Sequence, residues 1–243
     1  MYGYGYGMGY GFYGMDWTYI LVLIGAILCV AASAKVNSTY NKYSKVRSMT
    51  GMTGAQVAQK ILQYNGIYDV QIEHVRGNLT DHYDPSKKVL RLSDSVYGST
   101  SVAAIGVAAH ECGHAVQHQV GYVPIKIRSV LVPAANIGSK LGLPLILLGV
   151  IFGGAGSTLA QIGIWVFALA VLFQIVTLPV EFNASGRAIK MLDQYGILHH
   201  QEVGHVKKVL SAAALTYVAA AASAILQLLR LVLIFGGGRD RRD

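Results

Sequence analysis

The chain has 243 residues, of which 53% are apolar and only 13% are charged, and its mean hydropathy is +0.44. Soluble domains carry about 25% charged residues, so this composition predicts a membrane protein with modest soluble parts. The net charge of +8 would suggest nucleic-acid binding in a soluble protein, but here the positive-inside rule and contact with membrane lipid explain it. No P-loop, no GxGxxG after a strand and no basic-aromatic face is present, so we expect no nucleic-acid partner. The two cysteines form no C-x-x-C pair and imply no disulfide framework.

Residues 1–16 are almost entirely Gly, Tyr and Met, a low-complexity composition that cannot form a core, and we interpret them as a disordered tail. Residues 17–34 are an uncharged apolar run, just long enough to cross a bilayer as a first transmembrane helix. Basic residues follow this run and none precedes it, which favours an uncleaved anchor with the N-terminus outside. A cleaved signal peptide is the alternative, because the Ala-Ser-Ala sequence at 32–34 resembles a signal-peptidase site.

Residues 35–128 are predicted to form the main soluble part. A short helix is expected over Thr53–Tyr64, where it is closed by an Asn-Gly pair. Apolar and polar residues alternate around 70–74 as in a strand, and Val89–Ser93 is a second strand candidate after a turn at 84–86.

The segment Val102–Gln119 is rich in Ala, free of Pro, preceded by Ser and Thr residues that can cap a helix, and followed by Gly121. It contains the sequence His-Glu-Cys-Gly-His at 110–114, which matches the H-E-x-x-H pattern of zinc-dependent peptidases. Two residues four apart are separated by roughly 400° on a helix, so His110 and His114 share one face and can share one metal, while Glu111 can activate a water. Cys112 points to the other side of the helix and is not expected to be a ligand.

The rest of the chain is mostly apolar. Residues 129–180 are predicted to form a transmembrane hairpin. Its first helix is interrupted by Pro133, Pro144 and Lys140, so we expect it to be kinked; the alternative is that Lys140 snorkels to the interface or lines a cavity. We expect a second catalytic segment at 181–210, a fourth transmembrane helix at 211–235 and a solvated tail at 236–243. The segment 35–128 carries eleven Lys or Arg and 181–210 carries four, which places both in the cytoplasm. The three Arg of the final tail conflict with this orientation, so the fourth span is alternatively a re-entrant or tilted helix.

A zinc hydrolase needs a third protein ligand. His118 continues the stripe of His110 and His114, but it lies one turn further along the helix and cannot reach the same metal without a break. Glu181 follows a long apolar run on the same side of the membrane and can fold back over the motif helix. It is the better candidate, and the alternative is an ordinary carboxylate at the membrane interface.

Four segments together resemble the zinc metallopeptidases of the YugP type, from about Thr50 to Leu210 and in matching order. These segments are Ala109–His118, Leu79–Pro85, Val89–Ser93 and Leu178–Phe182. The order of motif, two spans and then a glutamate is also similar to the HtpX and CAAX-protease type of membrane gluzincin. The resemblance implies a small α+β zincin-like catalytic domain on the cytoplasmic side of a mainly α, polytopic membrane protein with about four transmembrane helices.

The same resemblance implies that His110, His114 and Glu181 hold Zn²⁺ and that Glu111 is the general base. Candidates for oxyanion or substrate contacts are His82, Tyr83 and Arg187. Candidates for orienting the ligands are His118, Asn183 and Ser185. The chain departs from the relatives at two of these positions, because an Asp is expected where Asn183 stands in YugP-like chains and where Ser185 stands in HtpX-like ones.

The sequence therefore predicts a membrane-bound zinc endopeptidase that cleaves membrane-associated or unfolded proteins. In a gluzincin, the strand before the motif helix is an edge to which an extended substrate adds, so Val89, Leu90, Arg91, Leu92 and Ser93 are expected to bind substrate. The alternative function is a non-catalytic membrane scaffold with a structural zinc. The expected partners are protein or peptide substrates and membrane lipid, and an oligomer or a regulatory partner is compatible with the sequence.

Overall fold

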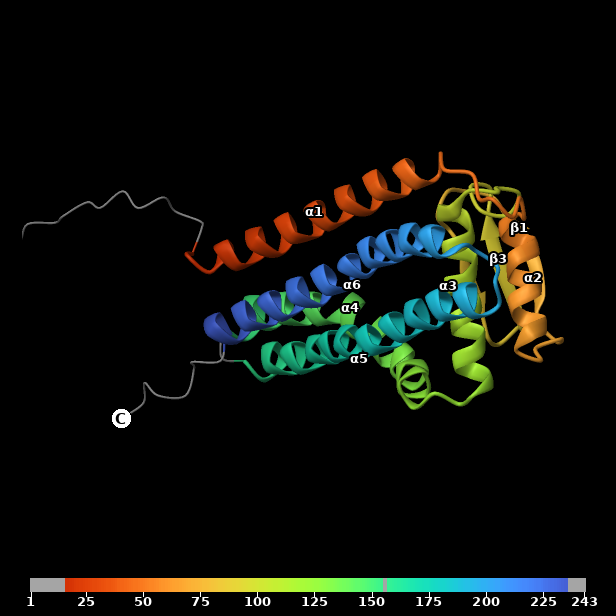
Figure 1. Cartoon of the computed structure of the whole chain (residues 1–243). Coiled ribbons are helices and arrows are strands. Elements are labelled where there is room, and N and C mark those ends of the chain that lie inside the picture. Colours follow the sequence, from red (N-terminus) through yellow and green to blue (C-terminus); the bar gives the residue numbers. More distant parts are fainter. Residues whose placement is uncertain (1–15, 155–156, 236–243) are drawn as a thin grey trace, which may run out of the picture.

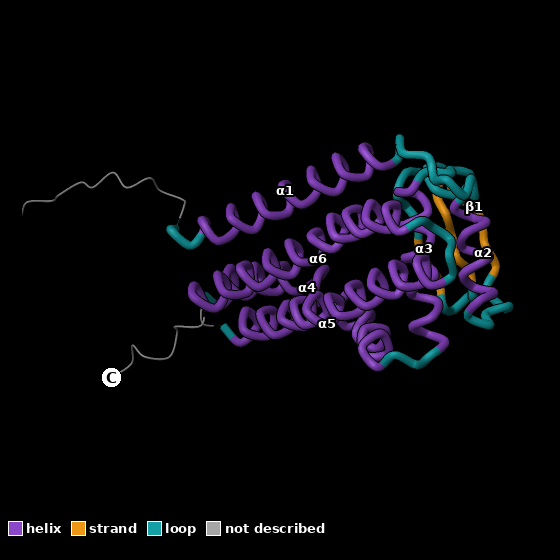
Figure 2. Tube along the Cα trace, in the orientation of Figure 1, coloured by secondary structure: helices purple, strands orange, loops and turns teal. Residues whose placement is uncertain are grey.

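The computed structural model describes residues 16–154 and 157–235. Its long helices extend together from one end of the molecule, while all the strands and the two shorter helices gather at the other end (Figure 1; Figure 2). Four helices are long and apolar enough to cross a membrane, and these are α1 (Tyr19–Tyr43), α4 (Val123–Gly153), α5 (Thr158–Gln194) and α6 (His200–Phe235). The predicted fold class, mainly α with about four spans and a small sheet, is confirmed. The interpretations of the Gly/Tyr tail before Asp16 and of the tail after Phe235 lie outside the described residues.

The long helices turn large apolar side chains outward. Ile27, Phe152 and Trp165 are 57%, 82% and 76% exposed, which would be costly in water and suits lipid. Small residues bring α4 and α5 together, because a Cβ atom added at Gly149 would lie 2.3 Å from the amide nitrogen of Ala160. Since lipid offers no hydrophobic drive between helices, this close backbone approach is what holds the hairpin together.

The helices do not stop where the polarity of the sequence changes. Helix α4 contains Pro133 and Pro144 and bends along its length in Figure 1, as the kink prediction required. Helix α5 continues through Glu181, and α6 begins well before residue 211. The predicted boundaries at 128/129, 180/181 and 210/211 thus fall inside helices, and where they lie relative to the membrane stays a prediction.

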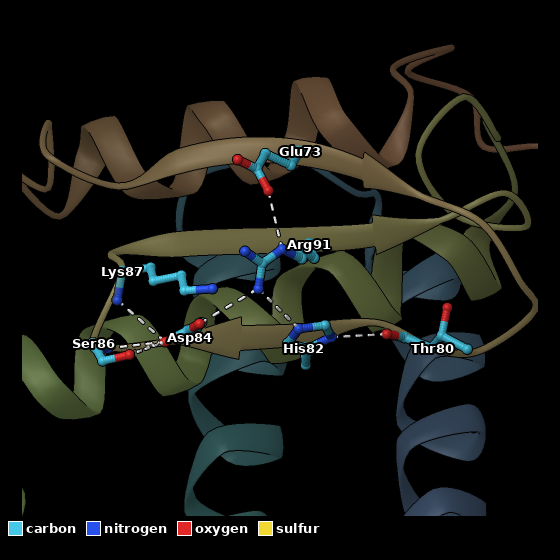
Figure 3. Close-up of polar contacts among 7 residues, drawn as sticks. All are labelled: Glu73, Thr80, His82, Asp84, Ser86, Lys87 and Arg91. Atoms are coloured by element: carbon cyan, nitrogen blue, oxygen red, sulfur yellow. Dashed lines mark hydrogen bonds and ion pairs between the residues drawn. The ribbon is translucent and has the colours of Figure 1, made fainter.

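The soluble end is built from α2 (Gly54–Tyr64), β1 (Gln71–Val75), β2 (His82–Asp84), β3 (Val89–Ser93) and α3 (Val102–Gln119). Helices α2 and α3 cover one face of the sheet (Figure 3). Their side chains form a core with the inward residues of β3, and its fully buried members include Ile61, Leu62, Leu90, Leu92 and Ile105. Both helices begin at caps, since the hydroxyl oxygen of Thr53 accepts from the amide of Gln56 and that of Ser101 accepts from the amide of Ala104.

The sheet has the order β1-β3-β2, so β3 is its central strand. Strand β1 pairs with β3 in parallel along all of Val89–Ser93, and β2 pairs with the other side of β3 in an antiparallel hairpin. The prediction that Val89, Leu90, Arg91, Leu92 and Ser93 form the substrate edge is therefore wrong, because both sides of this strand are already paired. The edges of the sheet are β1 and β2.

Candidate metal centre

The motif histidines lie on the buried middle of α3. Their rings are 4.8 Å apart between centroids and nearly perpendicular. Helix α5 crosses α3 at this point, and the crossing depends on Gly113, where an added Cβ would lie 2.6 Å from the carbonyl oxygen of Ala184. The glycine within the motif thus lets a second helix approach the histidines.

Glu181 reaches the histidines from α5. Its Oε2 atom is 3.3 Å from Nε2 of His110 and 3.5 Å from Nε2 of His114, and the residue is 2% exposed. Tetrahedral zinc with bonds of about 2.1 Å separates its ligand atoms by about 3.4 Å. The two separations to Glu181 match this spacing, and the three residues form a group able to hold a metal ion.

The buried Oε2 of Glu181 provides an independent test of that fit. Within the described residues, no hydrogen-bond donor satisfies this atom, whereas its neighbour Oε1 is 3.3 Å from a guanidinium nitrogen of Arg128. A buried carboxylate oxygen without a partner is costly. A cation between Oε2 and the two imidazoles would remove that cost, so the donor set fits zinc.

The remaining imidazole nitrogens are held by polar side chains. Nδ1 of His114 is 3.0 Å from Oε1 of Gln117, whose Nε2 donates to the carbonyl of Val180 at 2.8 Å and to Oδ1 of Asn183 at 3.0 Å. Because both amide hydrogens of Gln117 are used in this way, its oxygen accepts from His114, which places the proton on Nδ1 and leaves the lone pair of Nε2 free for a metal.

His110 is also held through its Nδ1, which is 3.1 Å from Oγ of Ser185. Of the three residues predicted to orient the ligands, Ser185 contacts a histidine directly and Asn183 acts through Gln117. His118 instead lies beside the ring of Tyr83, with centroids 5.6 Å apart, and burial lowers its pKa. Cys112 is buried against α2, where its Sγ is 3.6 Å from the carbonyl of Ala58 and burial raises its pKa well above the ordinary value.

Two hollows meet at Glu111. The first, of about 280 Å³, is bordered by His114 and Glu181 on one side and by β2 and α4 on the other. The second, of about 180 Å³, lies beside His110 and is lined mainly by apolar residues of α1, α3 and α6. Glu111, Asp81 and Tyr217 border both hollows, so a chain passing from one hollow to the other would cross the carboxylate of Glu111.

Of the three residues predicted to contact the oxyanion or the substrate, two line a hollow and one does not. His82 and Tyr83, on β2, line the first hollow. Arg187 is not among the residues that line either hollow, and its Nε donates to Oδ1 of Asn183 at 2.8 Å. Asp81 directly precedes β2, and its carboxylate accepts from the amide and the hydroxyl of Ser93. Burial nevertheless raises the pKa of Asp81.

Four residues of the site were not predicted from the sequence, and they are Asp81, Gln117, Arg128 and Tyr217. Gln117 had a usable signal, since it is three residues after His114 and therefore on the same face of a helix that is otherwise apolar there. Arg128 and Tyr217 lie on α4 and α6, far from the motif in sequence, and no local pattern indicates that they reach it.

The site is similar to that of a zinc peptidase, and it lies at one end of a bundle of apolar helices. This combination is similar to the class of membrane-bound zinc peptidases. The family described as "Putative neutral zinc metallopeptidase" matches residues 18–236, and the chain belongs to that family. It is 49% identical over 223 residues to the protein named "Putative membrane protease YugP" of Bacillus subtilis (strain 168), an alignment that covers 91% of this chain and 98% of the relative. No solved structure matches the chain.

Proposed function

We propose that this protein is a zinc-dependent membrane endopeptidase in which His110, His114 and Glu181 hold the metal and Glu111 is the general base. The observation that carries the proposal is the convergence of two histidine Nε2 atoms on a buried glutamate oxygen that lacks a partner. Membership of the zinc metallopeptidase family supports the same function. A structural zinc in a scaffold would call for a fourth protein ligand, and the group found in the described residues has three.

Zinc held there would supply a Lewis acid that lowers the pKa of water to about 7 and polarises a carbonyl. Glu111, at the junction of the two hollows, accepts the proton of the attacking water and returns it to the leaving amine. Tyr217 borders both hollows, and its hydroxyl is the donor that we assign to the developing oxyanion. Arg128 holds the second oxygen of Glu181 and so fixes the direction of the first.

Strand β2 provides the edge for an extended substrate. It pairs with β3 on one side only, it is an edge of the sheet, and its residues His82 and Tyr83 border the first hollow. Backbone hydrogen bonds at this edge select a substrate for its extended conformation more than for its side chains. Unfolded or extended segments of membrane-associated proteins are therefore the favoured substrates. The apolar second hollow then receives an apolar side chain next to the cleaved bond.

The decisive experiment is digestion of an unfolded protein by the purified full-length protein, with the zinc content of each sample measured. Glu111→Gln should keep one zinc per chain and lose about 10²- to 10⁴-fold in kcat. Tyr217→Phe should keep zinc and lose about 10²-fold in kcat. Glu73→Gln, the same chemical change on the outer face of the sheet, is the matched control and should cleave like wild type. Undiminished cleavage by Glu111→Gln would refute its assignment as the base.

We also propose that the sheet and α3 face the cytoplasm, because fifteen basic residues lie in the segments 35–128 and 181–210. A cysteine placed at Ser86, in the exposed turn between β2 and β3, should resist an impermeant thiol reagent added to intact cells. A cysteine at Ser157, in the link between α4 and α5, should react and serves as the control. The reverse pattern would place the site outside the cell.

A further inference from the structure

A cavity of about 830 Å³ lies between α1 and α6, away from the two hollows at Glu111. On α1 it is lined by Lys35, Ser38, Thr39 and Lys42, which recur at intervals of three, four and seven residues and so share one face of the helix. On α6 the lysines at 207 and 208 occupy the facing position. Lysines from two helices therefore face the same cavity. An excess of lysine near the end of a membrane span is common, but it does not require the lysines of two helices to face each other.

Among the described residues, none that lines this cavity is acidic. Among the described ion pairs, none involves Lys35, Lys42, Lys207 or Lys208, and the one interaction found for these ammonium groups is that of Lys42 with the ring of Tyr43 at 5.6 Å. Four like charges around one space repel each other, so the arrangement is stabilised by an anion.

The cavity also offers donors and room. Thr39 and Ser211, which both carry hydroxyls, are among its lining residues. Beside Lys207 and Lys208 it is bordered by Gly204, where an added Cβ would meet nothing within 4 Å. Ammonium and hydroxyl groups donate to the oxygens of a phosphate, which accepts several such bonds at once.

The surroundings become apolar along α6, in the direction of its membrane-spanning part. Ala212 and Leu215 close the cavity at that end. Leu215 also borders a neighbouring apolar groove of about 380 Å³, which is lined further by Phe182, Ile189 and Val218. A charged cavity followed by an apolar groove matches an amphiphile that lies parallel to the helices, with its charged head in the cavity and its apolar chain in the groove.

We propose that the cavity between α1 and α6 binds a phosphate group, and that an anionic phospholipid supplies it, with its head group among the four lysines and an acyl chain along the apolar groove. A free phosphate ion shares the head-group chemistry but would leave the groove unused. The proposal rests on the lysine cavity alone and not on the zinc site.

The test uses the full-length protein in detergent and counts bound lipid by native mass spectrometry during titration with phosphatidylglycerol or with phosphatidylcholine of the same chains. The double variant Lys207→Gln/Lys208→Gln should weaken phosphatidylglycerol binding by roughly 30-fold and leave phosphatidylcholine binding unchanged. The matched control Lys87→Gln/Lys190→Gln removes the same charge from exposed positions outside the cavity and should bind like wild type.

Equal weakening by the cavity and control variants, or equal binding of the two lipids to wild type, would overturn the proposal, because bulk surface charge would then explain the binding. Displacement of phosphatidylglycerol by inorganic phosphate at equal concentration would overturn the assignment to a lipid. Lys35→Gln/Lys42→Gln alters the cavity from α1 and should repeat the loss, which keeps the test valid if the α6 variant fails to fold.

Discussion

Two clusters of acidic, basic and imidazole side chains, one on the outer face of the sheet and one where α3 meets α5, differ in how fully their polar atoms are paired. On the outer face of the sheet, Arg91 contacts Glu73 at 3.0 Å, His82 at 3.3 Å and Asp84 at 3.4 Å (Figure 3). Hydrogen bonds from Ser86 and from the amide of Lys87 hold the pKa of Asp84 at about 2. Both carboxylates drawn on this face, those of Glu73 and Asp84, have partners of complementary chemistry.

The cluster on the inner side of α3 uses the same residue types and leaves one atom unsatisfied. Arg128 pairs with one oxygen of Glu181, and the other oxygen faces two histidine nitrogens without a donor. The outer cluster is complete as a structural ion-pair network, whereas the inner cluster needs a ligand. In this comparison, an unsatisfied buried carboxylate oxygen facing two imidazoles, more than charge density, is what makes the inner cluster the candidate ligand site.

The largest effect should come from removing a histidine of each cluster in turn. His114→Ala deletes one of three ligands, and we expect zinc to fall from one per chain to nearly none, with proteolysis lost as well. His82→Ala removes a histidine of the outer cluster, and its zinc content should match that of wild type. Metal analysis after gel filtration measures both. Loss of zinc from His82→Ala, with retention by His114→Ala, would reverse the assignment of the two clusters.

A smaller effect should come from Gln117, which orients a ligand without touching the metal. Gln117→Met removes the acceptor for Nδ1 of His114 and should lower zinc affinity by about 10- to 100-fold, measured by competition with a chelator. Gln117→Glu keeps an acceptor at that position and should bind zinc more tightly than Gln117→Met. Equal affinities of the two variants would mean that Gln117 serves to connect α3 with α5 and not to position the histidine.

The smallest effect should come from the outer cluster itself. Glu73→Gln removes one partner of Arg91 at a half-exposed position, and exposed pairs contribute about 0–1 kcal/mol. For a chain of this size we expect the apparent Tm to fall by at most about 2–4 °C, with zinc and proteolysis unchanged. A fall of 10 °C or more in thermal unfolding would show that this network carries more of the fold than its exposure suggests.

Local patterns were sufficient for the elements of the soluble end other than β2. The helix predicted at Val102–Gln119 and the strand predicted at Val89–Ser93 have the observed bounds. Caps, alternation and helical spacing act over a few residues, so they can be read from the chain directly. Strand β2 was not predicted, because three residues next to a proline turn carry almost no periodicity and become a strand only by pairing with β3.

The candidate site, too, was predicted in part from the sequence and in part was visible only in the structure. The sequence by itself determined that His110, Glu111 and His114 share a helix with metal-binding spacing, that long apolar helices flank them, and that Glu181 is the best candidate for a third ligand. Only the tertiary structure decided that Gln117 and Ser185 hold the histidines, that Arg128 and Tyr217 border the first hollow, and that β2 rather than β3 is the free edge beside it. Apart from the contact between Gln117 and His114 inside α3, these contacts join α3 to α4, α5, α6 and the sheet between residues far apart in the chain, such as His110 and Ser185. They depend on where helices cross, as at Gly113 and Ala184, and a crossing is fixed by the shapes of two surfaces that no local pattern encodes.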